Sequence, residues 1–185
     1  MIAITSSDDF RMFTDPLFVL LSTAVKGDAV VLDIDATVLF QSEGIENTCD
    51  AELNPRGVGI YNLCINYNIP VFFVTARLHV PENVEKTMAQ LQCMGFFRYA
   101  GLYMRPAHVT GWPAISQYKG IVRQQIAQKF NILLNVGDMW ADLHMVTDES
   151  VLHALHKDSG NRHVLFKPHS NEPAMWALKL AETRH

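Results

Sequence analysis

Short apolar runs that alternate with longer helical segments constrain the fold of this chain more than any other feature of its sequence. This alternation is typical of a parallel β-sheet with helices packed on both faces. The sequence therefore predicts a doubly wound (Rossmann-like) α/β fold on a parallel sheet of about five strands. The expected strands cover residues 29–34, 70–75, 100–105, 132–137 and 163–167.

Helix signals stand at the ends of the segments between these strands. Asn54 and Pro55 offer a cap and a first-turn proline, and Gly95 is placed to end a helix that Pro81 opens. The polar stretch 41–53 is expected to be a loop or hairpin. The expected helices cover residues 16–25, 55–67, 81–94 and 115–130.

Length and composition are those of one globular domain over residues 1–185. Hydrophobic residues make up 49% of the chain and charged residues 18%, which argues against disorder. The formal net charge of −4 supplies no general basic field for nucleic acid. Nucleic acid is therefore not the expected partner, although a local basic groove is left open.

The cysteines and the apolar stretch 16–25 predict a cytoplasmic protein without membrane contact. Cys49, Cys64 and Cys93 are an odd number without paired spacing, which suits a reducing compartment better than a disulfide framework. The stretch 16–25 is too short to span a bilayer. It also follows acidic residues, where a secretory leader has basic ones. Assembly into a homo-oligomer is left open.

Polar residues stand where several expected strands end. Asp33 and Asp35 close the first strand, Thr75 ends the second, and Asp138 directly follows the fourth. Lys119 lies near the beginning of the helix that leads to the fourth strand. Right-handed crossovers place these strand ends along one edge of the sheet, where ligands bind. Since an unpaired buried carboxylate is costly, we expect these groups to meet in one crevice and serve chemistry there.

Such a group of side chains suits phosphoryl transfer. Of two nearby aspartates, one attacks as a carboxylate while the other exchanges a proton with the leaving group. Mg²⁺ takes oxygen ligands, which Asp33, Asp138 and the backbone carbonyl of Asp35 offer. Lys119 and the Thr75 hydroxyl are suited to hold phosphoryl oxygens.

Four stretches resemble, in the same order, the four motifs of the haloacid dehalogenase (HAD) superfamily. They are "DIDATVL", "VFFVTAR", "YKG" and "VGDMWADL", and together they span roughly residues 29–144. Within the superfamily the chain is most similar to the acid phosphatase branch, of the bacterial class B and plant types. It departs from that branch at Ala36, where relatives usually have a second aspartate, and at Ala76, where glycine is frequent.

The resemblance implies a role for each matching residue. Asp33 would be the nucleophile that forms an aspartyl-phosphate, and Asp35 would protonate the leaving alcohol and then activate water. Thr75 and Lys119 would bind the phosphoryl group, and Arg77 is a further candidate for contact with phosphate or substrate.

The resemblance also implies a Mg²⁺ site. Asp33, Asp35 and Asp138 would hold the ion, and Asp142 would support it directly or through water. A cap for the helix that follows it is the alternative reading of Asp142.

The intervals between the motifs leave no room for a large cap domain. We therefore expect an open site, covered by the loop at 41–53 or by a neighbouring subunit. Such a site admits phosphomonoesters of many sizes, including small metabolites, nucleotides, phosphoprotein side chains and nucleic-acid ends.

The resulting expectation is a capless, Mg²⁺-dependent phosphomonoesterase. A first alternative is a nucleotide or polynucleotide-end phosphatase, with a short basic path through Arg77, Arg105 and Lys119. A second is a non-catalytic storage or phosphate-binding protein on the same scaffold. The complete set of site residues favours catalysis over this second alternative.

Overall fold

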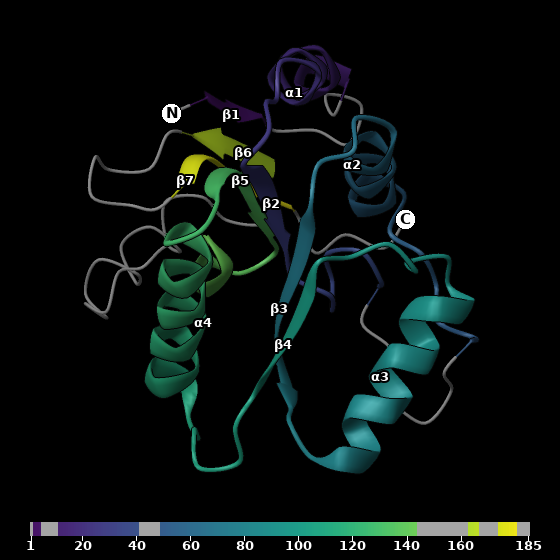
Figure 1. The fold of residues 1–185 in the computed structure, drawn as a ribbon, viewed down its shortest axis with the longest axis vertical. Helices are drawn as coiled ribbons and strands as arrows, with labels where there is room; N and C mark the ends of the chain where they lie inside the picture. Colours follow the sequence, from purple (N-terminus) through teal and green to yellow (C-terminus); the bar gives the residue numbers. More distant parts are fainter. Residues whose placement is uncertain (1, 5–10, 41–48, 144–162, 167–173, 181–185) are drawn as a thin grey trace.

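The computed structural model describes residues 2–4, 11–40, 49–143, 163–166 and 174–180 of the 185-residue chain. Within these residues one seven-stranded sheet runs in the order β1-β6-β7-β5-β2-β3-β4 (Figure 1). Its strands are β1 (Ile2–Ile4), β2 (Asp28–Leu32), β3 (Val71–Leu78), β4 (Gly101–Arg105), β5 (Asn131–Gly137), β6 (His163–Phe166) and β7 (Ala174–Lys179). The helices are α1 (Arg11–Ser22), α2 (Pro55–Asn66), α3 (Pro81–Cys93), α4 (Trp112–Ala127) and the short 3₁₀ turn η2 (Trp140–Asp142).

Five adjacent strands, β7, β5, β2, β3 and β4, are parallel, which confirms the predicted α/β fold. The expected strand at 163–167 does form, as β6, but it is antiparallel to β7, and β1 is antiparallel to β6. Residues 167–173 between β6 and β7 are too few for the crossover that parallel neighbours need. The fifth parallel position therefore belongs to β7, a strand that the sequence analysis did not identify.

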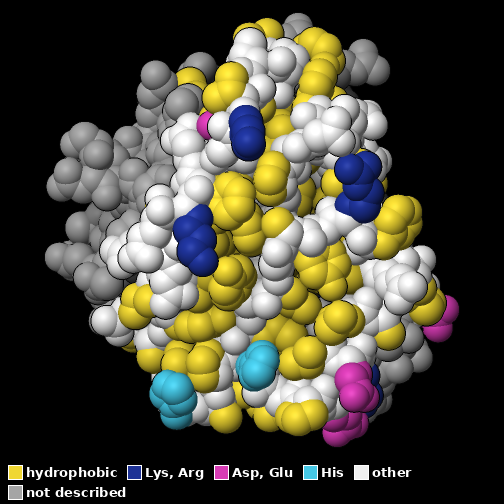
Figure 2. All heavy atoms as spheres, in the orientation of Figure 1, with side chains coloured by type: hydrophobic (Ala, Val, Ile, Leu, Met, Phe, Trp, Pro, Cys, Tyr) yellow, Lys and Arg dark blue, Asp and Glu magenta, His cyan; other side chains and the backbone are white. Residues whose placement is uncertain are grey.

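Helices cover both faces of the sheet. On one face α1, α2 and α3 pack through a core that includes Leu17, Tyr61, Phe73 and Leu91. On the other face Val122 and Ile126 of α4 pack against β2, β3 and β5. Figure 2 shows hydrophobic side chains gathered across the middle of the view, over β3 and the edge strand β4.

The helix-end signals act largely as expected. The Asn54 side chain accepts a hydrogen bond from the Arg56 amide at 3.2 Å, and Pro55 opens α2. Gly95 follows α3 with a φ of +92°, a backbone conformation that glycine adopts most easily. The outer limits differ by a few residues: α1 begins at Arg11 and contains Pro16, and α4 runs from Trp112 to Ala127.

The expectation of three reduced cysteines is wrong. Cys49 and Cys93 form a disulfide with their Cα atoms 5.7 Å apart, and Cys64 is a buried free thiol in α2. The pair is 44 residues apart, and only the packing of α3 beside the segment at Cys49 brings the two together. Sequence spacing carried no signal of this pairing.

No helix among the described residues combines the length and apolar character that crossing a membrane requires.

Candidate active site

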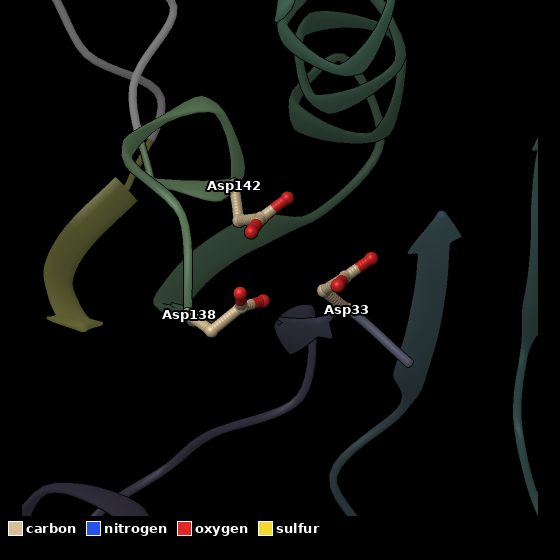
Figure 3. A group of neighbouring side chains, drawn as sticks. All are labelled: Asp33, Asp138 and Asp142. Carbon is tan, nitrogen blue, oxygen red and sulfur yellow. The ribbon is translucent and has the colours of Figure 1, made fainter. Parts of the chain in front are cut away.

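Three aspartates meet at the carboxyl end of the sheet. Asp33 is the first residue after β2, Asp138 the first after β5, and Asp142 closes the turn η2. All three are buried, and one carboxylate oxygen from each lies within 4.8 Å of the others. Figure 3 shows the three side chains converging on one small region. The structure thus brings Asp33, Asp138 and Asp142 together as the sequence predicted.

Lys119 brings the compensating charge from α4. Its Nζ donates to Asp33 Oδ1 at 2.9 Å and also to Asp142 Oδ1. The ammonium is almost fully buried. With all three carboxylates ionised, the single ammonium would leave a net charge of −2 (−3 + 1) in a buried site.

Burial and mutual repulsion oppose ionisation of these carboxylates. Burial, followed by the Asp142 carboxylate, raises the pKa of Asp33 to about 7 against the opposing effect of Lys119. Burial, followed by Asp142 and Asp33, likewise raises the pKa of Asp138 to about 8. Burial alone would lower the pKa of Lys119, but the two carboxylates outweigh it and the pKa is raised. Without a cation, the site therefore retains protons near neutral pH.

The donor set fits a divalent hard cation. Its ligand atoms are carboxylate oxygens, and a divalent charge would neutralise the net −2 of the cluster. Asp142 Oδ2 accepts from the Met139 amide at 3.0 Å while Oδ1 accepts from Lys119. Asp142 thus caps its own turn and faces the cluster. The following helix, which the alternative reading has it cap, lies outside the described residues, and its support of a metal ion stays a prediction.

Two glycines allow the backbone to approach closely around this cluster. A Cβ on Gly137 would lie 2.1 Å from Asp142 Cβ, so the residue before Asp138 has no room for a side chain. A Cβ on Gly57 of α2 would lie 2.0 Å from the backbone oxygen of Thr37. The buried Thr37 hydroxyl in turn donates to Asp138 Oδ1 at 3.4 Å. The chain after β2 is therefore held between α2 and the carboxylates.

Ala36 lies within this tight segment in a left-handed conformation, with a φ of +56°. Its carbonyl accepts from the Asn54 side chain at 3.3 Å. Aspartate tolerates this backbone region better than alanine, so Ala36 is a less favourable residue here than the aspartate that the resemblance leads us to expect.

Asp35 faces a different cation from Asp33. Arg77 Nε donates to Asp35 Oδ2 at 2.9 Å, and Nη2 donates to Oδ1 at 2.7 Å. The Asp35 side chain is 37% exposed, whereas that of Arg77 is 6% exposed. Because β2 ends at Leu32, the two aspartates do not share a strand face, and each has its own partner.

A bulge in β3 places Thr75 and Arg77. The pairing of β3 with β4 shifts between Thr75 and Leu78, and the Arg105 side chain donates to the Ala76 carbonyl there. Thr75 is buried, and its hydroxyl oxygen accepts from the Arg77 amide at 3.2 Å. That leaves the Thr75 hydroxyl hydrogen for a ligand. The Arg77 guanidinium lies on Asp35, and its direct contact with phosphate stays a prediction.

Sequence reasoning missed two residues behind Arg77. Arg77 Nη1 donates to Gln90 Oε1 at 2.7 Å and to Thr87 Oγ1 at 3.4 Å. With Leu91, these residues form the buried face of α3 at helical spacing. Polar residues at such buried positions are a sequence signal that would have pointed to them.

The strand order and the polar residues at the strand ends are those of a HAD-like fold with a phosphatase site. Residues 43–170 match the family model described as HAD superfamily, subfamily IIIB (acid phosphatase), so the chain belongs to this subfamily and is a phosphatase acting on phosphomonoesters. The matched range contains Thr75, Lys119, Asp138 and Asp142. Asp33 and Asp35 precede it and join the site through the contacts described above.

Solved structures give the same fold. A class C acid phosphatase from Bacillus anthracis superposes with a TM-score of 0.58 at 17% identity, covering 84% of this chain and 74% of its own. The same enzyme with tungstate bound superposes with a TM-score of 0.58 at 18% identity, covering 82% and 68%. No curated protein matches the sequence significantly. The expected likeness to HAD acid phosphatases is thus confirmed.

Proposed function

We propose that this phosphatase is Mg²⁺-dependent and works through an aspartyl-phosphate on Asp33. The observation that carries the proposal is the buried cluster of Asp33, Asp138 and Asp142, which in its ionised form keeps a net charge of −2 after pairing with Lys119. A phosphatase site with this charge calls for a divalent cation before it can accept an anionic substrate.

In the first step a carboxylate oxygen of Asp33 attacks phosphorus while the bond to the leaving oxygen breaks. Lys119 holds Oδ1, so Oδ2 is the oxygen placed for attack. Asp35, which enters this step in its protonated form, gives its proton to the departing alkoxide, which leaves as an alcohol. In the second step Asp35 takes a proton from water, the water oxygen attacks phosphorus, and the bond to Asp33 breaks. Inorganic phosphate leaves and the Asp33 carboxylate is restored.

The phosphoryl oxygens would be held by the Thr75 hydroxyl and by the third N–H of Lys119, with Arg77 as a further donor. Asp33, Asp138, the Asp35 carbonyl and Asp142, the last directly or through water, are the proposed Mg²⁺ ligands. The bound ion supplies charge neutralisation at the phosphoryl oxygens.

Substitution of the nucleophile tests this proposal. Asp33→Asn should abolish hydrolysis of p-nitrophenyl phosphate at saturating Mg²⁺, and the exposed Asp50→Asn should retain it. Wild-type turnover no faster than that of Asp33→Asn would contradict the enzyme mechanism and favour the binding-protein alternative. Beryllium fluoride should bind at Asp33 as a phosphoryl mimic, and its appearance on another residue would refute the assigned nucleophile.

We propose an open site for the substrate. The end of β3, α3, β4 and the first half of α4 account for the whole interval between Thr75 and Lys119, which leaves no inserted domain there. Of the loop expected to cover the site, residues 41–48 lie outside the described residues. Initial rates on metabolites, nucleotides, phosphopeptides and 5′-phosphorylated oligonucleotides would identify the preferred phosphomonoester and test the nucleotide and polynucleotide-end alternatives.

Further proposals concern the whole chain. We keep the single domain over residues 1–185 and leave self-association open. The cytoplasmic location stays a prediction. The cysteines no longer support it, because a disulfide such as Cys49–Cys93 is typical of oxidising compartments. Alkylation of thiols in the native source, followed by mass measurement, would tell the oxidised pair from the reduced one.

A further inference from the structure

Helix α3 buries two polar side chains on the face that it packs against the rest of the protein. Thr87 and Gln90 are both 0% exposed, and they share the sheet-facing side of α3 with Leu91. Burial of an amide is unfavourable unless its hydrogen bonds are made. Gln90 Nε2 has no hydrogen-bond partner among the described residues, so this position of α3 buries an amide whose hydrogen bonds are only partly made.

The bonds that Thr87 and Gln90 do make go to Arg77. Gln90 Oε1 accepts from Arg77 Nη1 at 2.7 Å, and Thr87 Oγ1 lies 3.4 Å from the same nitrogen. The Nε and Nη2 side of the guanidinium binds both oxygens of Asp35. The planar group is therefore held on one side by α3, and its other side holds the carboxylate.

We infer that Gln90, assisted by Thr87, is a positioning residue that acts through Arg77 to fix Asp35 for proton transfer to the leaving group. This inference rests on the proposed function, in which Asp35 is the acid. None of the sequence motifs contains Gln90 or Thr87.

The need for such positioning follows from where Asp35 lies. It stands beyond the end of β2 with a 37% exposed side chain, so packing alone does not select its orientation. Proton transfer requires an oxygen within hydrogen-bond reach of the leaving group. A guanidinium that is itself held binds both oxygens in one plane. The remaining lone-pair position on each oxygen, one of which holds the proton of the acid, stays open toward a substrate.

A comparison of two leaving groups separates positioning of an acid from a general structural role. Nitrophenolate departs readily without protonation, whereas an alkoxide depends on it. The ratio kcat/KM reports the step in which the leaving group departs, whereas kcat also includes the hydrolysis common to both substrates. For Gln90→Leu we expect kcat/KM to fall roughly tenfold or more with an alkyl phosphate, but by no more than about threefold with p-nitrophenyl phosphate.

Three further variants calibrate this comparison. Gln92→Leu makes the same change at an exposed position of α3 and should leave both ratios as in the wild type. Gln90→Glu keeps an accepting oxygen for Arg77 and should retain most of the alkyl phosphate rate. Thr87→Val removes the weaker bond and should shift the selectivity in the same direction as Gln90→Leu, by less, which keeps the test available if Gln90→Leu does not fold.

Asp35→Asn distinguishes a failure of the positioning role of Gln90 from a failure of the proposed acid role of Asp35. In one outcome Asp35→Asn lowers kcat/KM far more with the alkyl phosphate than with p-nitrophenyl phosphate, while Gln90→Leu and Thr87→Val lower the two values equally or lower neither. The positioning role is then overturned and the acid role stands. If Asp35→Asn itself shows no discrimination, the proposed acid role fails, and the inference about Gln90 fails with it.

Discussion

The Nζ of Lys119 lies 2.9 Å from Oδ1 of Asp33, and both side chains are almost entirely buried. The residues are 86 positions apart in sequence and come from α4 and the end of β2. A buried ion pair contributes little net stability, but the loss of one partner leaves an unpaired charge that is costly. Lys119 therefore makes a site with three carboxylates tolerable in the fold.

We predict that Lys119→Met will damage both stability and activity. Without the ammonium, the ionised cluster would carry −3 instead of −2, and a buried pair that loses one partner costs about 3–5 kcal/mol. Urea unfolding of the metal-free protein should show this loss, and kcat/KM for p-nitrophenyl phosphate should fall at least about 100-fold.

Lys129→Met is the matched control, because Lys129 is exposed just beyond α4. Its unfolding midpoint and its kcat/KM should remain close to those of the wild type. Equal losses in the two variants would mean that the effect comes from the methionine and not from the pairing with Asp33.

The metal-free protein should lose stability as pH rises. The pKa of Asp33 is raised from 3.8 to about 7, and that of Asp138 from 3.8 to about 8. The folded protein then keeps protons that the unfolded chain releases, so this stability is full below about pH 4 and is lost as pH rises through the folded pKa values. The slope is up to about 1.4 kcal/mol per pH unit for each retained proton.

Unfolding in EDTA and in Mg²⁺ across this pH range measures the effect. A divalent cation binds the deprotonated carboxylates, so stabilisation by Mg²⁺ should grow between about pH 5 and about pH 8. Asp138→Asn should flatten the metal-free profile. A metal-free protein that is more stable at the alkaline end of this range would contradict the raised pKa values.

The positions of Asp33, Thr75 and Asp138 followed from the sequence because strand ends in a parallel sheet share one edge. The pairing of Asp35 with Arg77 did not, since it depends on a bulge in β3 that no residue pattern marks. Strand β7 was missed for a related reason. Its sequence, "AMWALK", consists largely of good helix formers, and its place beside β5 overrides that preference.

We expect the Cys49–Cys93 disulfide to stabilise the fold substantially. Its two cysteines are 44 residues apart, and closing a loop of that length contributes about 4 kcal/mol in the chain-entropy account. Cys93→Ser should lower the free energy of unfolding by up to about this amount. Cys49→Ser should have a similar effect, and the double variant should lose no more than either single variant. Additive losses would show that the cysteines act separately.

Two glycines of α2 give a matched pair for the last prediction. A Cβ on Gly57 would lie 2.0 Å from the backbone oxygen of Thr37, whereas a Cβ on Gly59 would meet nothing within 4 Å. Gly57→Ala must therefore displace either α2 or the segment that carries Thr37, whose hydroxyl bonds Asp138. We expect it to destabilise the protein by about 1–3 kcal/mol and to weaken Mg²⁺ binding.

Gly59→Ala makes the same change two residues along the helix. Alanine is the better helix former by about 0.8–1.0 kcal/mol, so this variant should be neutral or slightly more stable, with unchanged Mg²⁺ affinity. Urea unfolding and Mg²⁺ titration of both variants provide the measurement. Because the gain in helix propensity is common to both variants, a loss of stability and Mg²⁺ affinity confined to Gly57→Ala would be due to the contact with Thr37. Equal behaviour of the two variants would show that α2 does not support the metal site.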